Sequence, residues 1–247
     1  MDPFCFLDRC GSHENFSLQE LFAPGTRFVK LKGVWYVTPR REAVTLSELI
    51  NLLRSAETVE QIDEHRQEIL ELLPEIKIMV DYDQKNYAHQ YDLWFHSLHT
   101  VVYLPRDGDD GMLYLAALLH DIGKPRAQQR GKDPEDPYMH YYGHPEISRQ
   151  ITENIIIPNL ASRGYELDPD ERERLIFYVM HHDDRISLKP SKVRSIYKLR
   201  PDLFCKLMEL ETADGKAHIM IKPVVDRIDT CSLLADPDYV RDLLEKA

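Results

Sequence analysis

Apolar side chains recur at three- and four-residue intervals through most of the chain, a period that predicts helices around a shared core. The first predicted helix begins after Thr45, forms a capping box with Glu48, and carries Leu46, Leu49 and Leu53 on one face. Further helices are predicted at 58–73, 91–104, 112–120, 145–161, 168–182, 190–199, 201–217, 223–234 and 237–246. We therefore expect a mostly α protein, built as a helical bundle.

The N-terminal part of the chain has a different pattern. Residues 1–25 show no period and are interpreted as irregular. Two short runs of β-prone residues, 28–31 and 34–37, follow and predict a small hairpin. We divide the chain into an N-terminal extension, residues 1–71, which also holds the first two predicted helices, and a helical domain, residues 72–247.

The charge balance is acidic, with 31 Lys and Arg against 42 Asp and Glu and a formal net charge of −11. This excess argues against broad binding to nucleic acid or to an anionic membrane, so neither intact RNA nor a membrane is expected as a partner. The sequence has no apolar run of transmembrane length and no signal-peptide pattern, and we expect a cytoplasmic protein. The four scattered cysteines are expected to be reduced thiols.

Histidines are unevenly distributed, since eight of the 11 fall between residues 89 and 182. Clustered histidines are typical of metal sites. His120-Asp121 is the sharpest case, because it ends the apolar run 115–119, where a buried charged pair needs compensation. A bound metal ion is one compensation and a helix-end salt bridge is the other. This segment alone leaves both open.

Other metal-ligand residue types lie on the predicted helices or at their ends. His96 and His99 share one helix face, His144 begins a helix, and His182 ends another. Asp214 lies in mid-helix, where Asp is unfavourable. Each of them, taken alone, also fits a hydrogen-bonded core residue, a cap or a solvated helix end. Helix bundles, however, build metal sites from inward-facing histidines and carboxylates on different helices.

The order His96, then His120-Asp121, then a distant Asp214 resembles the H…HD…D signature of the HD-domain superfamily of metal-dependent phosphohydrolases. Longer segments are similar to the HD region of bacterial CCA-adding tRNA nucleotidyltransferases: Leu72–Ile76, Tyr91–His99, Ala116–Pro125, His140–His144 and His181–Asp183. The resemblance covers about residues 72–217 and implies an HD-type helical bundle with a small N-terminal extension. Residues 1–71 resemble no nucleotidyltransferase domain, so CCA addition is not expected.

The resemblance also implies one or two divalent metal ions, with Mn, Fe, Co, Ni, Zn and Mg all open. The ligands it implies are His96, His120, Asp121 and Asp214 for one ion, and His144 and His182 for a second ion that Asp121 bridges. Metal-activated water would then hydrolyse a phosphate ester of a nucleotide or another small molecule. The expected partner is thus a small phosphorylated substrate.

Three residues are the catalytic candidates in this scheme. They are Asp121, together with Lys124 and Arg185 as cations that bind the phosphate. Residues expected to orient the metal ligands or to contact the substrate are His89, His99, His140, Glu146, His181 and Asp183. Lys216 is a weaker candidate for the pocket, and His218 is assigned to local packing. The polar, proline-containing segment 124–142 is expected to be a loop that acts as a lid or sets specificity.

Two alternative functions remain open. A non-catalytic nucleotide- or RNA-binding HD module would not need the whole ligand set and would not have to retain stoichiometric metal. A structural metal protein would close every coordination position and unfold when the metal is removed. The sequence fixes neither the substrate nor the oligomeric state.

Overall fold

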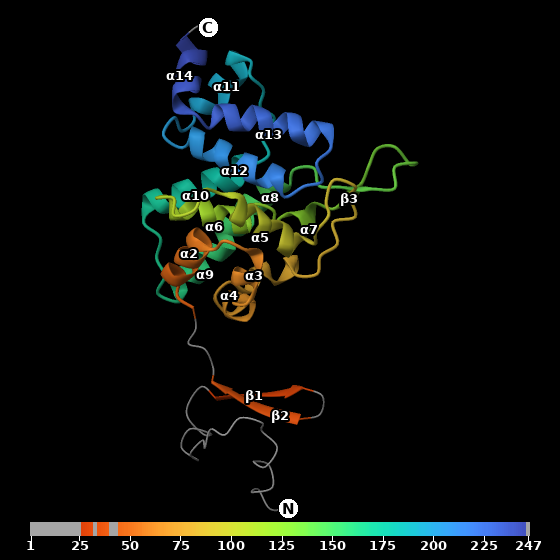
Figure 1. Cartoon of the computed structure of the whole chain (residues 1–247), viewed down its shortest axis with the longest axis vertical. Coiled ribbons are helices and arrows are strands. Elements are labelled where there is room, and N and C mark those ends of the chain that lie inside the picture. Colours follow the sequence, from red (N-terminus) through yellow and green to blue (C-terminus); the bar gives the residue numbers. More distant parts are fainter. Residues whose placement is uncertain (1–25, 32–33, 40–43, 246–247) are drawn as a thin grey trace, which may run out of the picture. The chain divides into compact units, whose positions relative to one another are not determined.

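The computed structural model describes residues 26–31, 34–39 and 44–245. The chain divides into two compact units, Met1–Ala43 and Val44–Ala247. Residues 1–25, predicted to be irregular, lie outside the described part. The second unit, orange to blue in Figure 1, holds the helices and the candidate site described below.

The first unit contains an antiparallel hairpin of β1 (Thr26–Leu31) and β2 (Val34–Pro39). In its register Phe28 pairs with Val37. The predicted hairpin is thereby confirmed. The turn between the strands, at 32–33, lies outside the described residues.

Three helices begin the second unit: α2 (Leu46–Ser55), α3 (Val59–Asp63) and α4 (Arg66–Leu72). The predicted capping box of Thr45 and Glu48 is present at the start of α2. The single helix predicted at 58–73 is instead two. At the break between them, the Asp63 carboxylate accepts hydrogen bonds from Arg66 Nε at 2.7 Å and from Trp94 Nε1 at 2.8 Å.

These three helices share the core of the helices that follow. Leu49, Leu53, Ile62 and Ile69 are fully buried in the same apolar cluster as the later helices. The compact unit therefore begins at Val44, whereas the sequence analysis divided the chain after residue 71. The apolar faces of the early helices need a partner surface, and the later helices supply it.

The centre of the unit is formed by α5 (Leu93–Tyr103) and α6 (Gly111–Leu119), each capped by an aspartate. Asp92 accepts a hydrogen bond from the backbone N–H of Phe95, and Asp110 accepts one from Met112. Every residue of α6 from Met112 onward is buried, because α2, α5 and α10 (Pro169–His181) pack around it. Helix α6 thus runs through the interior of the bundle.

The remaining helical elements agree with the predicted segments to within a few residues, apart from the two short helices η2 and α7. They are η2 (Pro74–Met79), α7 (Lys124–Ala127), α8 (His144–Ile151), η3 (Thr152–Ile156), α9 (Ile157–Ser162), α11 (Pro190–Tyr197), α12 (Phe204–Lys216), α13 (Lys222–Leu234) and α14 (Pro237–Glu245). The π-helical turn η3 joins α8 to α9, which matches the single run predicted at 145–161. Within the described residues, no helix is both long enough and apolar enough to span a membrane.

The segment 124–142 is more ordered than the predicted loop. It contains α7 and a second antiparallel hairpin of two short strands, β3 (Gln129–Arg130) and β4 (Met139–His140). Strands of two residues leave almost no periodic signal, so the pattern of apolar residues could not predict them. Figure 1 shows this hairpin extending away from the helices.

Candidate metal centre

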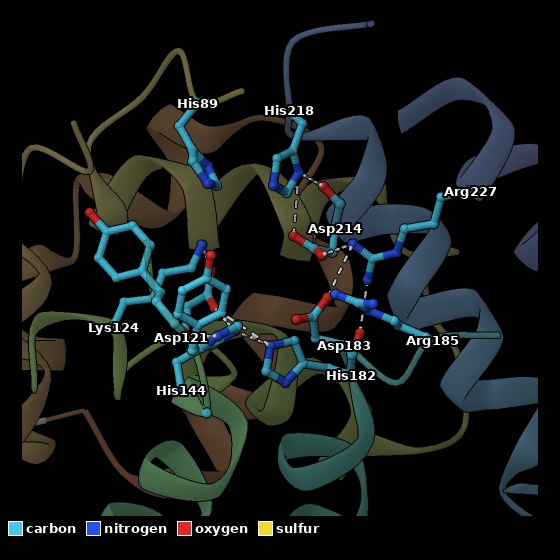
Figure 2. Close-up of a pocket in the computed structure, with 13 residues that line it drawn as sticks. His89, Asp121, Lys124, His144, His182, Asp183, Arg185, Asp214, His218 and Arg227 are labelled. Carbon is cyan, nitrogen blue, oxygen red and sulfur yellow. Dashed lines mark hydrogen bonds and ion pairs between the residues drawn. The ribbon is translucent and has the colours of Figure 1, made fainter. Parts of the chain in front are cut away.

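Six buried side chains from five helices converge in the interior of the second unit. They are His96 on α5, His120 and Asp121 at the end of α6, His144 on α8, His182 at the end of α10, and Asp214 on α12. Because α6 is buried along its length, His120 and Asp121 emerge inside the fold rather than at its surface. Figure 2 shows Asp121, His144, His182 and Asp214 facing a common space.

The first group consists of His96, His120, Asp121 and Asp214, whose ligand-type atoms all lie within 4.8 Å of one another. His96 Nε2 is 3.3 Å from Asp121 Oδ2 and 3.0 Å from Asp214 Oδ1. His120 Nε2 is 3.1 Å and 3.6 Å from the same two oxygens. Two imidazole nitrogens and two carboxylate oxygens thus surround one point.

The second group consists of Asp121, His144 and His182. Asp121 Oδ1 is 3.0 Å from His144 Nε2 and 3.5 Å from His182 Nε2. Asp121 therefore presents Oδ2 to the first group and Oδ1 to the second. This is the geometry that a carboxylate needs to bridge two adjacent cations.

Backbone carbonyls orient three of the histidines. The Nδ1 atoms of His120, His144 and His182 lie 2.8–2.9 Å from the carbonyl oxygens of Ala117, Tyr141 and Val179. A ring that donates its Nδ1 proton to a carbonyl carries its lone pair on Nε2, the usual state of a metal-ligating histidine. The Nε2 atoms of His144 and His182 then face each other at 3.0 Å as two lone pairs. A cation bound by both rings would remove that repulsion.

Several atoms of the cluster are buried without a hydrogen bond. These atoms are His96 Nε2, His120 Nε2 and both carboxylate oxygens of Asp121. Buried polar atoms without partners are costly, and a bound cation is one way to satisfy them all. The donor set of imidazole nitrogens and carboxylate oxygens suits Mn²⁺, Fe²⁺, Co²⁺, Ni²⁺ or Zn²⁺. The residues present therefore fit a divalent metal.

The electrostatics of the cluster also favour a bound cation. Burial by itself raises the pKa of Asp121, but His120 and Lys124 together hold it well below its usual range. Burial likewise opposes ionisation of Asp214, whereas His218 and Arg227 lower its pKa. Burial lowers the pKa of His120, yet the two carboxylates outweigh burial and raise it to about 10. Two ionised carboxylates in a dry interior thus attract positive charge.

A cavity of about 390 Å³ opens over the cluster. Its walls include Asp121, His182 and Asp214, and three cationic side chains, Lys124, Arg185 and Arg227. Lys124 is buried, with Nζ 2.6 Å from Asp121 Oδ2 and 2.9 Å from Gln84 Oε1. Arg185 is exposed at the edge of the cavity. A ligand entering the cavity therefore meets both the cluster and positive charge.

The model of the HD domain matches residues 63–202, more than half of the chain. The chain belongs to the HD domain family. The predicted resemblance is thus confirmed. Asp214 lies beyond the matched range, but α12 returns it to within 3.0 Å of His96. The HD signature is therefore complete only in the folded chain.

Two proteins from bacteria are similar over part of this HD domain chain. A CC-adding tRNA nucleotidyltransferase of Thermus thermophilus is 32% identical over 148 residues, which cover 59% of this chain and 32% of the relative. An A-adding tRNA nucleotidyltransferase of Deinococcus radiodurans is 28% identical over 131 residues, which cover 52% of this chain and 28% of the relative. The chain thus spans about a third of the length of these relatives.

The structure brings two further histidines to the cavity. His89 and His218 line it with their rings 4.4 Å apart, and Figure 2 shows both above Asp214. His218 was assigned to local packing; its Nδ1 lies 2.8 Å from the carbonyl oxygen of Asp214, and its ring also lines the cavity. Burial lowers the pKa of His218 to about 4. The i, i+4 spacing from Asp214 is the signal that could have identified it.

Arg227 on α13 is a site residue that sequence reasoning missed. Its guanidinium group lies 3.1 Å from Asp214 Oδ2 and donates a hydrogen bond of 2.9 Å to the carbonyl oxygen of His182. Nε donates to the buried Glu211 at 3.4 Å. Arg227 thus contacts Asp214 of the first group and the backbone of His182 of the second. No local pattern in the sequence marks it, because it reaches the site only through the packing of α13 on α12.

Several predicted site residues lie outside the cluster. His99 stacks on Tyr91 with ring centroids 4.0 Å apart, and Lys216 is exposed. The remaining three pair with side chains near them in sequence: His140 with Asp136, Glu146 with Arg149, and His181 with Asp184. Asp183, in contrast, lines the cavity.

Proposed function

We propose that this HD domain is a metal-dependent phosphohydrolase that cleaves a phosphate ester of a nucleotide or another small molecule. The observation that carries the proposal is the position of Asp121. Both of its oxygens are buried, Oδ2 is ion-paired with Lys124, and each oxygen faces a separate group of histidines beside an open cavity. A metal site with only a structural role would not need a side that is open to a cavity.

The ligands proposed for one ion are His96, His120, Asp121 and Asp214, and those for a second are Asp121, His144 and His182. A divalent ion held there would supply Lewis acidity and activate water for attack on phosphorus. The chain holds the two carboxylates ionised, and the carbonyl-bound rings of His120 and His144 turn their Nε2 atoms toward Asp121. The six proposed ligands are themselves buried, which strengthens these electrostatic interactions.

The cations around the cavity have separate proposed roles. Lys124 is bonded to Asp121 and Gln84, so it stabilises the bridging carboxylate and directs positive charge into the cavity. Arg185, exposed at the edge, is free to form bidentate hydrogen bonds to phosphate oxygens. The cavity volume of about 390 Å³ falls in the range of small-molecule binding sites. We therefore propose a small phosphorylated substrate rather than intact RNA.

The test is hydrolysis by purified protein loaded with Mn²⁺, Co²⁺ or Ni²⁺, measured as phosphate release for phosphomonoesters and as the ring-opened product, separated by chromatography, for cyclic substrates. The substrates are phosphomonoesters, 2′,3′-cyclic nucleotides and cyclic dinucleotides, and Asp121→Asn is the matched inactive variant. We expect turnover of at least one class by the wild-type protein and none by the variant. If protein with confirmed bound metal turns over none of these substrates, the proposal fails and a non-catalytic nucleotide-binding module takes its place.

A further inference from the structure

An exposed aromatic side chain stands at the wall of the cavity. Tyr142 lines the cavity and is 56% exposed, although it lies only two residues before the buried His144. An exposed tyrosine ring leaves a large apolar surface in water. Tyr141, its neighbour, is buried and donates a hydrogen bond to the carbonyl oxygen of Gln84. The chain thus turns one tyrosine into the protein and the next one outward.

Neighbouring side chains fix the orientation of Tyr142. The His140 ring stacks on it with an interplanar angle of 9° and centroids 5.3 Å apart. His140 Nδ1 also lies 3.2 Å from the Tyr142 hydroxyl, and its Nε2 lies 2.7 Å from Asp136 Oδ2. Gly131 passes close beneath His140, where a Cβ atom would approach Nε2 to 2.9 Å. Tyr142 is therefore held from one side, and its exposed fraction leaves the other side to solvent.

A second aromatic pair lies on the same segment. Tyr138 directly precedes β4, and Tyr142 follows it in the turn that leads to α8. Tyr138 packs on Tyr87 with ring centroids 5.0 Å apart. Backbone and side-chain bonds join the two segments: Met139 N–H donates to the carbonyl oxygen of Lys85, and Asn86 Nδ2 donates to that of Met139, both at 2.9 Å. We call Tyr87, Tyr138, His140 and Tyr142 the aromatic shelf.

We propose that the aromatic shelf binds the base of a nucleotide whose phosphate lies in the cavity. This inference rests on the proposed function, since it adds a base subsite to the proposed phosphate site. Tyr142 lines the cavity itself, so a single nucleotide reaches both the tyrosine ring and the cationic wall. Aromatic rings with an exposed face are the usual platforms for bases, and stacking is sequence-tolerant because every base has a π-face.

The cavity and the aromatic shelf differ in charge, and this difference supports a nucleotide as the ligand that occupies both. The cavity carries Lys124, Arg185 and Arg227, which suit a phosphate group. The shelf offers rings and the neutral hydroxyl groups of its tyrosines, which suit a flat, uncharged base. A sugar phosphate would leave the shelf uncovered, whereas a nucleotide would cover both. The proposed substrate class is thus narrowed to nucleotides and excludes base-free phosphate esters.

The test measures equilibrium binding rather than turnover. Protein loaded with Mn²⁺ is titrated calorimetrically with adenosine 5′-monophosphate and with ribose 5-phosphate, which differ only by the base. We expect the wild-type protein to bind the nucleotide about 10-fold more tightly, and Tyr142→Ala to lose that difference while keeping its affinity for ribose 5-phosphate. Tyr142→Phe keeps the ring and should keep the difference. Tyr103→Ala is the control, since Tyr103 is also exposed but lies outside the shelf.

Equal affinity of the wild-type protein for the two ligands, or no binding of either, overturns the inference. So does an equal loss for both ligands in Tyr142→Ala, because that result assigns the tyrosine to the phosphate. Absence of turnover with base-dependent binding intact would contradict only the proposed hydrolysis. A short single-stranded oligonucleotide in the same assay distinguishes the source of the base: if Tyr138→Ala weakens the oligonucleotide but not the mononucleotide, the shelf holds successive bases of a strand.

Discussion

The floor and the rim of the cavity are built in different ways. We call the six buried candidate ligands, on helices or at helix ends, the floor; four of them, Asp121, His144, His182 and Asp214, line the cavity. The rim is formed by Tyr142 and Arg185, which are exposed and lie on connecting segments. Helix ends anchored in a packed core hold side chains to a fixed geometry, whereas connecting segments vary without disturbing the core. We infer that the floor sets the chemistry and the rim sets the substrate.

The largest effect is expected at Asp121, which belongs to both halves of the floor. Asp121→Asn keeps the size of the side chain but removes the charge that would bridge two cations, so metal retention and hydrolysis should both be lost. Lys124 would also become a buried cation without its carboxylate partner, at a cost of about 3 kcal/mol. Metal content by mass spectrometry and the melting temperature measure the two effects separately. A folded variant with full activity would remove Asp121 from the mechanism.

The second prediction divides the floor into its two groups. His182→Ala removes a ligand of the second group only, so the variant should retain about one ion per chain and hydrolyse far more slowly. His181→Ala is a matched control, because the adjacent ring pairs with Asp184 instead of entering the cluster. Metal content per chain is the measurement. If it is the same in wild-type protein and in His182→Ala, the site holds one ion and His182 serves another purpose.

The third prediction compares Arg227, which bonds to two residues of the floor, with Arg185 of the rim. Arg227 bonds to Asp214 and to the backbone at His182, so Arg227→Lys, which cannot form the same fork, should lower metal affinity by about 10- to 100-fold. Arg185→Ala should leave metal affinity unchanged and raise KM. Metal titration and steady-state kinetics on both variants test this division. An identical response of the two variants would show that floor and rim are not separate.

The sequence predicted most of the helices because α5, α6, α10 and α12 carry a strong helical period and recognisable ends. The six residues proposed as ligands lie together in the floor: four come from the HD signature, and His144 and His182 are the two further histidines that the resemblance implied. The sequence did not mark Arg227, because Arg227 reaches the site only through the approach of α13 to α12. His218 was assigned to local packing, although its i, i+4 spacing from Asp214 was a signal that it lies beside that residue.

The boundary at residue 71 shows the same limit. The division after residue 71 follows the start of the family resemblance, and the resemblance does not indicate which helices share a core. The structure groups Leu49, Leu53 and Ile62 with the later helices, because their apolar faces are buried against them. The rim is the part of the site that the sequence predicted least. The two-residue strands β3 and β4 carry no period, so the stacking of His140 on Tyr142 could not be predicted.

The smallest effect on turnover is expected from substitution of Glu211, which contacts the floor only through Arg227. Burial raises the pKa of this carboxyl to about 8, although Arg227 opposes the shift. With a pKa of 4.5 in the unfolded chain, Glu211 takes up a proton on folding between about pH 4.5 and 8, so its contribution to stability is present at low pH and lost as the pH rises through 8. Glu211→Gln stays neutral and should lose this slope.

The measurement is the free energy of unfolding in urea at pH 5 and pH 8.5, with EDTA present so that metal binding does not contribute. We expect the stability of Glu211→Gln relative to wild type to be greater at pH 8.5 than at pH 5. Glu209→Gln, on the same helix but partly exposed, is the matched control and should follow the wild-type slope. An unchanged slope in Glu211→Gln would mean that Arg227 keeps Glu211 ionised throughout. Glu211 and Arg227 would then form a buried ion pair next to the floor, and Glu211 would not be a protonated acid.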